Sequence, residues 1–456
     1  MDTDQIIEQL LAEIRRLKEE NQELRERIAR LEKNSDNSSK PPSSDIVKPM
    51  RKTITHSRKK RKRGGQPGHR KFSRPTFPPE EIDEVIQYEL RAGDAIDLQP
   101  LDQWYVVQQI TLPKKLYHVT EHRARKYRDH RTGAIHIAPL PAEVVQGNLL
   151  GADMAAWVAF MKGGCHMSFS TIQQFCRQAM KLPLSRGLLS KATQKVSQAL
   201  KPMYDSLMER LPHETHLGVD ETGHKDQGHK HWTWCFQTSR YSLFHIDPSR
   251  GSQVLFELLG EDFQGILNCD YYGSYRKFSR LTDATVQYCM AHLIREIRFL
   301  AEHPWKPLAR WGNLLLDWIK KLFKTLHRYE SLTPAGFARR MKAIKQGFLD
   351  RVRKPPDHRL AQTLARRFKG KAAESYFQFL TDPLVEPTNN GTEREIRHTV
   401  IDRRITQGTR GDNGRRWSER IWTAMATCKK QDRNVFEFIH QSLLALWNHS
   451  QYPQLV

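Results

Sequence analysis

Three acidic residues have the types and surroundings of a site for phosphoryl transfer with two metal ions. Asp220 and Asp270 each end a short apolar run that reads as a β-strand, and Glu393 opens a run with helical spacing. Carboxylate oxygens suit the hard ion Mg²⁺, and two such ions about 4 Å apart support in-line attack on a phosphodiester. The two strands are predicted neighbours, so their carboxylates can converge. The pattern predicts that Asp220, Asp270 and Glu393 are catalytic and bind two Mg²⁺ ions, with Mn²⁺ as a substitute.

Each of these acids also has a simpler interpretation. Asp220 and the Glu-Thr-Gly that follows it would suit a turn. Glu221 would point to the opposite face of the strand because side chains alternate, so Asp220 is the preferred ligand. Asn390 and Glu393 have the spacing of a helix capping box, which alone would explain the glutamate. A capping side chain at a helix start can still face metal ions.

Cysteine and histidine give a weaker metal signal. Cys289 and His292 form a Cys-x-x-His pair that resembles half of a zinc site, but no second pair has matching spacing. A structural role, with His292 hydrogen-bonding near the acids, is favoured, and no zinc is expected. The six cysteines form no Cys-x-x-Cys pair, which is typical of a reducing compartment. With no long apolar stretch and no signal-like N-terminus, we expect a cytoplasmic, nucleoid-associated protein without a membrane partner.

The charge of the chain favours a polyanionic partner. Lys and Arg total 74 against 51 Asp and Glu, a net charge of +23. Arg397, one helical turn beyond Glu393, could pair with that acid or bind a phosphate oxygen. Two further groups are predicted to contact double-stranded DNA, mainly through its phosphates. The first group is the run Arg58, Lys59, Lys60, Arg61, Lys62 and Arg63. The alternative interpretation of this run is a solvated linker. The second group is Arg403, Arg404, Arg410, Arg415 and Arg416.

The N-terminal segment has a clear heptad repeat. One core position is occupied by Ile7, Ile14, Asn21 and Ile28, and the other by Leu10, Leu17, Leu24 and Leu31. β-Branched residues at the first position with Leu at the second favour a parallel two-stranded coil, and a single Asn fixes its register. The pattern predicts a homodimer or higher oligomer; a solvated helix packed on its own chain is the alternative.

The order of elements after residue 213 predicts an α/β, ribonuclease-H-like core. Strands are expected at 216–220, 231–237, 241–246, 265–270 and 285–290, with a helix near 252–260. The predicted N-terminal parts are a coiled coil (1–33), a disordered polar and basic DNA-binding linker (34–77), and a small β-rich domain that could also bind DNA (78–148). They are followed by a helical region that could hold a helix-turn-helix (149–212), the catalytic domain (213–430) with a helical insertion at about 293–385, and a C-terminal helix and tail (431–456). Within the β-rich domain, strands are expected at Trp104–Val107 and Leu116–Val119.

Several short motifs together resemble the DDE transposases of the insertion sequence 66 family. They are Asn-Ser-Ser-Lys-Pro-Pro-Ser-Ser-Asp at 37–45, Gly-Gly-Gln-Pro-Gly-His at 64–69, Asp220-Glu-Thr, Asp270 with a following Gly-Ser-Tyr, Cys289-x-x-His292, and Asn389-Asn390-x-x-Glu393-Arg394. The resemblance covers most of the chain and implies the same metal-binding triad, the Cys-x-x-His signature and a helical insertion before the glutamate. Relatives often carry paired cysteines after the basic tract, whereas residues 78–150 contain none, so this region either folds without zinc or is a diverged module.

The resemblance implies a bacterial insertion-sequence transposase. Such an enzyme binds terminal inverted repeats, cleaves a DNA strand with Mg²⁺ and joins the freed end to target DNA, with or without accessory proteins of the element. The alternative is a catalytically inactive, transposase-derived DNA-binding protein. A ribonuclease-H-like repair nuclease would explain the acids but not the N-terminal coil and basic tract.

Overall fold

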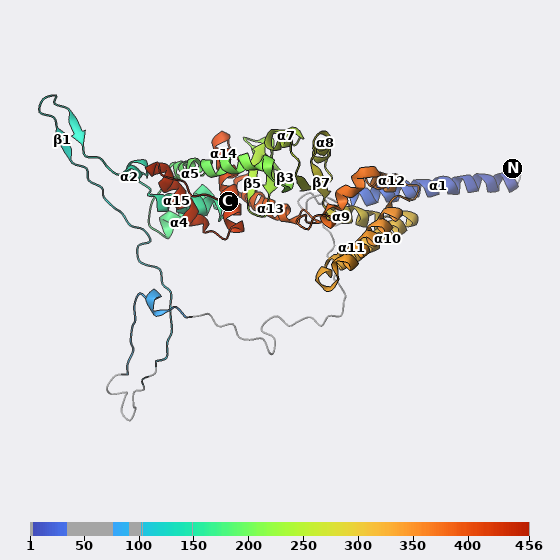
Figure 1. Ribbon diagram of the computed structural model, residues 1–456, viewed down its shortest axis with the longest axis horizontal. Coiled ribbons are helices and arrows are strands. Elements are labelled where there is room, and N and C mark those ends of the chain that lie inside the picture. Colours follow the sequence, from blue (N-terminus) through green and yellow to red (C-terminus); the bar gives the residue numbers. More distant parts are fainter. Residues whose placement is uncertain (1–2, 34–75, 91–101, 103, 148, 456) are drawn as a thin grey trace. The chain divides into compact units, whose positions relative to one another are not determined.

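The computed structural model describes residues 3–33, 76–90, 102, 104–147 and 149–455 (Figure 1). The basic run at 58–63 and the motifs at 37–45 and 64–69 lie outside these residues. The chain divides into two compact units, Met1–Pro49 with His122–Val456, and Met50–Glu121. Among the described residues, every helix is too short or too polar to cross a bilayer.

The described part of the unit Met50–Glu121 contains one 3₁₀ helix, η2 (Pro79–Glu81), and no strand. The strands predicted at Trp104–Val107 and Leu116–Val119 are therefore wrong. Tyr105 is 94% exposed and Val107 is 73% exposed, because no described strand pairs with this segment. The next described strands along the sequence are β1 (Lys126–Arg128) and β2 (Ile135–Ile137), an antiparallel hairpin that belongs to the other unit.

A five-stranded mixed sheet lies at the centre of the larger unit. Its strands follow the order β5-β4-β3-β6-β7, with β5, β4 and β3 antiparallel and β3, β6 and β7 parallel. Their bounds are β3 (His216–Asp226), β4 (His229–Gln237), β5 (Ser242–Asp247), β6 (Ile266–Cys269) and β7 (Thr285–Tyr288). Helix α7 (Gln253–Leu259) connects β5 to β6, and α8 (Gly273–Leu281) connects β6 to β7. The predicted α/β class is confirmed.

Strand β3 is longer than predicted and passes through Asp220 for six more residues. The Glu-Thr-Gly after Asp220 does not turn, because β4 pairs with β3 from Gly218↔Gln237 to Asp226↔His229. The turn lies instead at Gln227 and Gly228, whose φ angles of 51° and 85° are both positive, as a tight two-residue hairpin requires. Asp220 is thus a mid-strand residue.

The parallel pairing of β3 with β6 brings the two predicted catalytic aspartates together. His216 pairs with Ile266 and Gly218 with Asn268. The same offset, continued for two residues, places Asp220 beside Asp270, which directly follows β6. Neighbouring parallel strands lie about 4.8 Å apart, so these two carboxylates can share a ligand.

Helices α13 (Asn390–Thr406) and α14 (Asp412–Lys430) pack beside β3 and β5 (Figure 1). Three α14 side chains spaced four residues apart accept the outward N–H groups of the edge strand β5. Glu419 accepts from Ile246 N at 2.8 Å, and Thr423 and Thr427 accept from Phe244 N and Ser242 N. Because α14 covers the exposed edge of the sheet, the sheet cannot extend in that direction.

The remaining helices lie before and within this α/β core. The helices predicted within residues 149–212 are present as α3 (Ala152–Gly163), α4 (Phe169–Gln178), α5 (Arg186–Ala199) and α6 (Lys201–Arg210), followed by η3 (Leu211–His213). Helix α2 (Ala142–Gly147) precedes them, inside the region that was predicted to be β-rich. Between β7 and α13 lie α9 (Met290–Ala301), α10 (Lys306–Leu326), η4 (Tyr329–Ser331), α11 (Pro334–Val352), α12 (Arg359–Arg366), η5 (Gly370–Tyr376) and η6 (Gln378–Leu380). The chain closes with α15 (Val435–Asn448).

The N-terminal segment is the helix α1 (Thr3–Leu31). Its predicted heptad side chains are exposed by about half: Ile7 50%, Leu10 57%, Ile14 46%, Leu17 51%, Leu24 52%, Ile28 53% and Leu31 62%. Asn21, in the same stripe, is also exposed. The helix is confirmed, and its pairing with a second copy stays a prediction.

Candidate active site

The structure brings the three predicted acids into one electrostatic environment. Asp220 is half-buried in β3, Asp270 is half-buried after β6, and Glu393 lies in the first turn of α13. Burial raises the pKa of Asp220 well above its ordinary value, and the charges of Glu221, Asp270 and Glu393 raise it further. The carboxylates therefore repel one another across a shared space.

Asp270 shows the same crowding, and Glu393 has a buried oxygen. Burial raises the pKa of Asp270; Arg250 opposes this effect, while Glu393 adds to it. Oε1 of Glu393 is buried and has no hydrogen-bond partner among the described residues. All the candidate metal ligands are carboxylate oxygens. Their negative charges repel one another, and not all of these oxygens accept a hydrogen bond. Such a set of ligands fits hard divalent cations, whose charge would relieve the repulsion.

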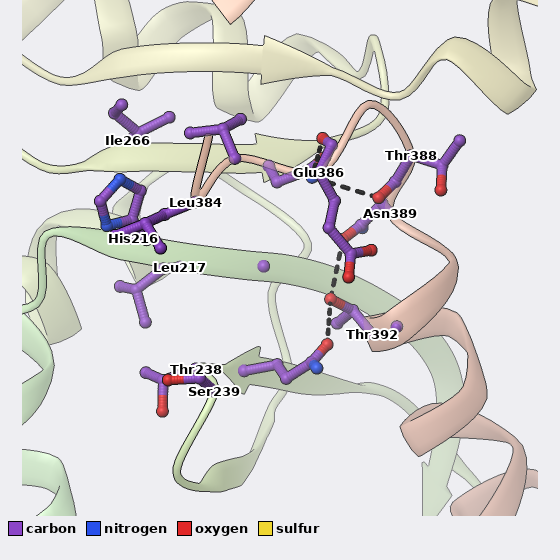
Figure 2. Close-up of a pocket in the computed structure, with 15 residues that line it drawn as sticks. His216, Leu217, Thr238, Ser239, Ile266, Leu384, Glu386, Thr388, Asn389 and Thr392 are labelled. Atoms are coloured by element: carbon purple, nitrogen blue, oxygen red, sulfur yellow. Dashed lines mark hydrogen bonds between the residues drawn. The ribbon is translucent and has the colours of Figure 1, made fainter. Parts of the chain in front are cut away.

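Close packing against β3 fixes the start of α13 (Figure 2). Asn389 donates its side-chain N–H to the Val219 carbonyl at 2.9 Å. The Thr392 hydroxyl lies 2.9 Å from Gln237 Oε1 and 2.7 Å from Asn389 Oδ1. A Cβ added to Gly218 would lie 2.2 Å from Thr392 Oγ1, so only glycine permits this approach. The helix that carries Glu393 is thereby held against the strand that carries Asp220.

This contact region borders a pocket of about 160 Å³ (Figure 2). The predicted capping box is wrong: α13 begins at Asn390, and its N-cap is Asn389, which makes no side-chain capping bond. The Asn389 side chain is used instead for the contacts with Val219 and Thr392. Capping therefore does not account for Glu393, and its carboxylate is left available to the acid cluster.

Cys289 and His292 lie at the start of α9, beside the acids. Cys289 Sγ accepts the backbone N–H of Asn389 at 3.1 Å, which helps to fix the segment before α13. His292 Nδ1 lies 3.7 Å from Glu393 Oε1, too far for the predicted hydrogen bond. Burial, together with Arg295, lowers the pKa of His292 to about 4, so the ring is neutral near pH 7.

Ligand atoms of Cys289, His292 and Glu393 all lie within 4.8 Å of one another. The thiolate is the form of cysteine that binds metal. Burial raises the pKa of the Cys289 thiol, which disfavours that form. The protonated thiol is thus a poorer metal ligand than the carboxylate oxygens.

Glu221 points away from Asp220 and is engaged with other groups. Its carboxylate accepts from Arg250, with Nη2 at 2.6 Å, and from the buried Tyr275 hydroxyl. Arg250 also stacks on Tyr272 and Trp232, with its guanidinium carbon 4.0 Å and 4.6 Å from the ring centres. Burial and the Asp270 charge raise the pKa of Glu221 to about 7.

Sequence reasoning preferred Asp220 over Glu221 but missed the support behind it. Tyr275 belongs to the Gly-Ser-Tyr after Asp270, so its position carried a signal. Arg250 lies in the connection between β5 and α7, and nothing in its local sequence marks it.

The predicted basic residues after α13 divide into two groups. Arg415 pairs with the buried Asp226, which also accepts from Thr409 Oγ1 and Gly411 N, each at 2.8 Å. Arg416 pairs with Glu419 at 3.1 Å. These two arginines therefore help to hold the loop and helix together, and their predicted contact with DNA stays a prediction.

The other arginines near α13 remain oriented outward. Arg403 donates to Thr222 Oγ1 at 3.2 Å, beside the acid cluster. Arg404 and Arg410 are exposed. Nearer the start of α13, Arg394 and Arg397 are also exposed, and Arg394 donates to the carbonyl of Asn390. The loop fixed by Asp226 thus presents the exposed Arg410 at the far end of β3 from Asp220.

A second cluster, Glu26, His303 and His358, joins α1 to the helices that precede α13. Ligand atoms of the three residues lie within 4.8 Å of one another. Nδ1 of His303 accepts from Trp305 N, and Nδ1 of His358 accepts from Leu360 N, each at 3.2 Å. A metal-bound histidine instead donates from its other ring nitrogen. The arrangement fits a hydrogen-bonded contact between helices better than a metal centre.

With this geometry established, comparison with known proteins gives the family. The family model described as the transposase IS66 family matches residues 147–416, more than half of the chain. The chain belongs to the IS66 transposase family. The matched segment contains Asp220, Asp270 and Glu393 together with the helices between β7 and α13. The predicted family is confirmed.

Two further similarities extend beyond this segment. Residues 2–75 match a family of unknown function (DUF6444). The uncharacterized protein y4qI of Sinorhizobium fredii (strain NBRC 101917 / NGR234) is 21% identical over 409 residues, which cover 83% of this IS66 family chain and 75% of that protein. The likeness to this relative therefore runs through most of both chains.

Proposed function

We propose that this chain is a DNA transposase in which Asp220, Asp270 and Glu393 bind two Mg²⁺ ions. The observation that carries the proposal is the placement of three carboxylates on β3, after β6 and at the start of α13, where the charges of Asp270 and Glu393 raise the pKa of Asp220. Their mutual repulsion suits cation binding, and Glu393 Oε1 is buried without a hydrogen bond, with Arg295 Nη2 at 3.8 Å as an ion-pair partner. Membership of the IS66 transposase family supports the same conclusion.

We further propose a ribonuclease-H-like core for residues 213–430. The sheet order β5-β4-β3-β6-β7 supports this assignment, because β5, β4 and β3 are antiparallel to their neighbours and β3, β6 and β7 are parallel. The helices from α9 to η6 would be the insertion before the glutamate. The exposed heptad side chains of α1 support a parallel coiled coil between two copies.

The substrate would be double-stranded DNA at the terminal inverted repeats of the element. When bound, the divalent ions would activate the attacking oxygen and stabilise the leaving one. Asp220, Asp270 and Glu393 would hold them in a fixed place between β3 and α13. Arg403, Arg404 and Arg410 would bind phosphates of the same DNA. Water would first cleave the strand, and the freed 3′-hydroxyl would then attack target DNA.

The test is a Mg²⁺-dependent cleavage assay on DNA that carries the element ends. Asp220→Asn, Asp270→Asn and Glu393→Gln should each abolish cleavage while end binding is retained. Glu386→Gln, an exposed acid in the segment before α13, is the control and should cleave normally. Cleavage by purified triad variants would remove the assignment. A native protein that binds ends without cleaving them would instead be a transposase-derived DNA-binding protein.

A further inference from the structure

The hairpin β1–β2 is a well-formed element outside the catalytic core. Lys126 pairs with Ile137, Tyr127 with His136, and Arg128 with Ile135. The ladder continues on both sides, since Ala138 N donates to Arg125 O at 2.9 Å and Asp129 N to Ala134 O at 2.8 Å. At about 3.3 Å per residue, five residues give each side a length of about 16 Å.

The turn of this hairpin is fixed by its own residues. Asp129 Oδ1 accepts from the backbone N–H of Arg131 at 2.7 Å and of Thr132 at 3.2 Å. Gly133 has a φ of +67°, in the left-handed region, and donates to the Asp129 carbonyl. The Asp129 carboxylate is thus committed to the turn, and Arg131 is held at the tip.

The hairpin lacks a core of its own. All six residues of β1 and β2 are exposed, with Tyr127 at 57%, Ile135 at 60% and Ile137 at 60%. A two-stranded hairpin is marginally stable in water unless one face packs on something. These side chains therefore suit a surface that meets a partner.

The charge of the hairpin identifies the class of partner. Arg125, Lys126, Arg128 and Arg131 are all exposed, against one acid, Asp129, that is used in the turn. Cross-strand partners share a face, so Lys126 and Arg128 lie on the same side as Ile135 and Ile137. That face offers cations for phosphates and apolar groups for thymine methyls.

We infer that the β1–β2 hairpin inserts into the major groove of double-stranded DNA at the element ends. A two-stranded ribbon fits the roughly 12 Å width of that groove. The inference rests on the proposed function for its DNA substrate but not on the acid cluster. The hairpin would thus give the segment that follows residue 121 a role in DNA recognition that needs no zinc-binding cysteines.

The first test removes charge from the hairpin in the full-length protein. Arg128→Ala/Arg131→Ala should weaken binding to terminal DNA and lower the slope of log K against log salt by about 1.8, which corresponds to two phosphate contacts. Arg339→Ala/Arg340→Ala, an exposed pair on α11, loses the same charge and should keep the native slope. Equal losses in both variants would refute a specific role for the hairpin.

The second test alters shape without altering charge. Gly133→Val, at a positive φ that β-branched residues avoid, should distort the turn and reduce the preference for terminal over unrelated DNA. Gly133→Asn tolerates this conformation and should keep the preference. An unchanged preference in the Val variant would mean that the segment acts only as a basic tail, which overturns the inference.

The two proposals can fail separately. At low salt and saturating protein, hairpin variants should still cleave DNA with Mg²⁺, because their acids are intact. Normal end binding together with altered oligomeric state would show that the hairpin contacts a second copy instead of DNA, and would also overturn the inference.

Discussion

The substitution Gly218→Ala tests the packing that positions Glu393 without touching any acid. The added Cβ would lie 2.2 Å from Thr392 Oγ1, whereas ordinary contact begins at 3.4 Å. The start of α13 must therefore move away from β3 by about 1.2 Å. A displacement of about 1 Å in a catalytic group can cost about 100-fold in rate. We expect cleavage to fall by about that factor.

The assay is single-turnover cleavage of end DNA, with binding measured in parallel. Binding should be unchanged, and overpacking should lower the free energy of unfolding by about 1 to 3 kcal/mol. Gly223→Ala is a matched control on the same strand, since its added Cβ would meet nothing within 4 Å. That variant should retain native cleavage.

A compensating change strengthens the test. Thr392→Ala removes the atom that the new Cβ would strike, so Gly218→Ala/Thr392→Ala should recover part of the lost cleavage. Native cleavage by Gly218→Ala alone would refute the reasoning that contact between β3 and α13 sets the position of Glu393.

Three further outcomes follow from the structure. In metal-free buffer, the unfolding free energy should fall as the pH rises from about 4.5 to about 7, because Glu221 keeps a proton in the folded protein that it has lost in the unfolded chain. Urea titrations at several pH values should therefore show a smaller pH dependence for Glu221→Gln than for the native protein. Arg250→Met should lower the free energy of unfolding by about 2 to 3 kcal/mol, less than is typical for breaking a buried ion pair because Arg250 is 33% exposed. In the same urea titration, the unfolding free energy of Glu221→Gln/Arg250→Met should lie closer to that of the native protein. Leu17→Glu/Leu24→Glu should abolish self-association in light scattering, whereas Glu23→Ala, off the heptad stripe, should not.

Alternating apolar patterns and motif spacing were enough to predict much of the core. The runs ending at Asp220 and Asp270 gave two strands, and their pairing in register followed from the predicted order. The extent of β3 was not predictable from Glu-Thr-Gly alone, because the pairing of β4 with β3 overrides the local preference for a turn.

Other errors have a common physical origin in tertiary contacts. The helix begins at Asn390, which was predicted to be its N-cap, and the actual N-cap Asn389 makes no capping bond because its amide contacts Val219 and Thr392. The ion pair of Arg415 with the buried Asp226, 189 positions earlier in the chain, was not predicted. The segment Trp104–Val107 has strand-like composition and lacks a partner strand among the described residues. Local sequence carries none of this information.

The most direct measurement is anomalous diffraction from crystals of the protein bound to end DNA and soaked in Mn²⁺. The account predicts two Mn²⁺ peaks about 4 Å apart, each ligated by oxygens of Asp220, Asp270 or Glu393. Ordered end DNA with no Mn²⁺ peak near these carboxylates, or with Glu393 turned away from the two aspartates, would contradict it.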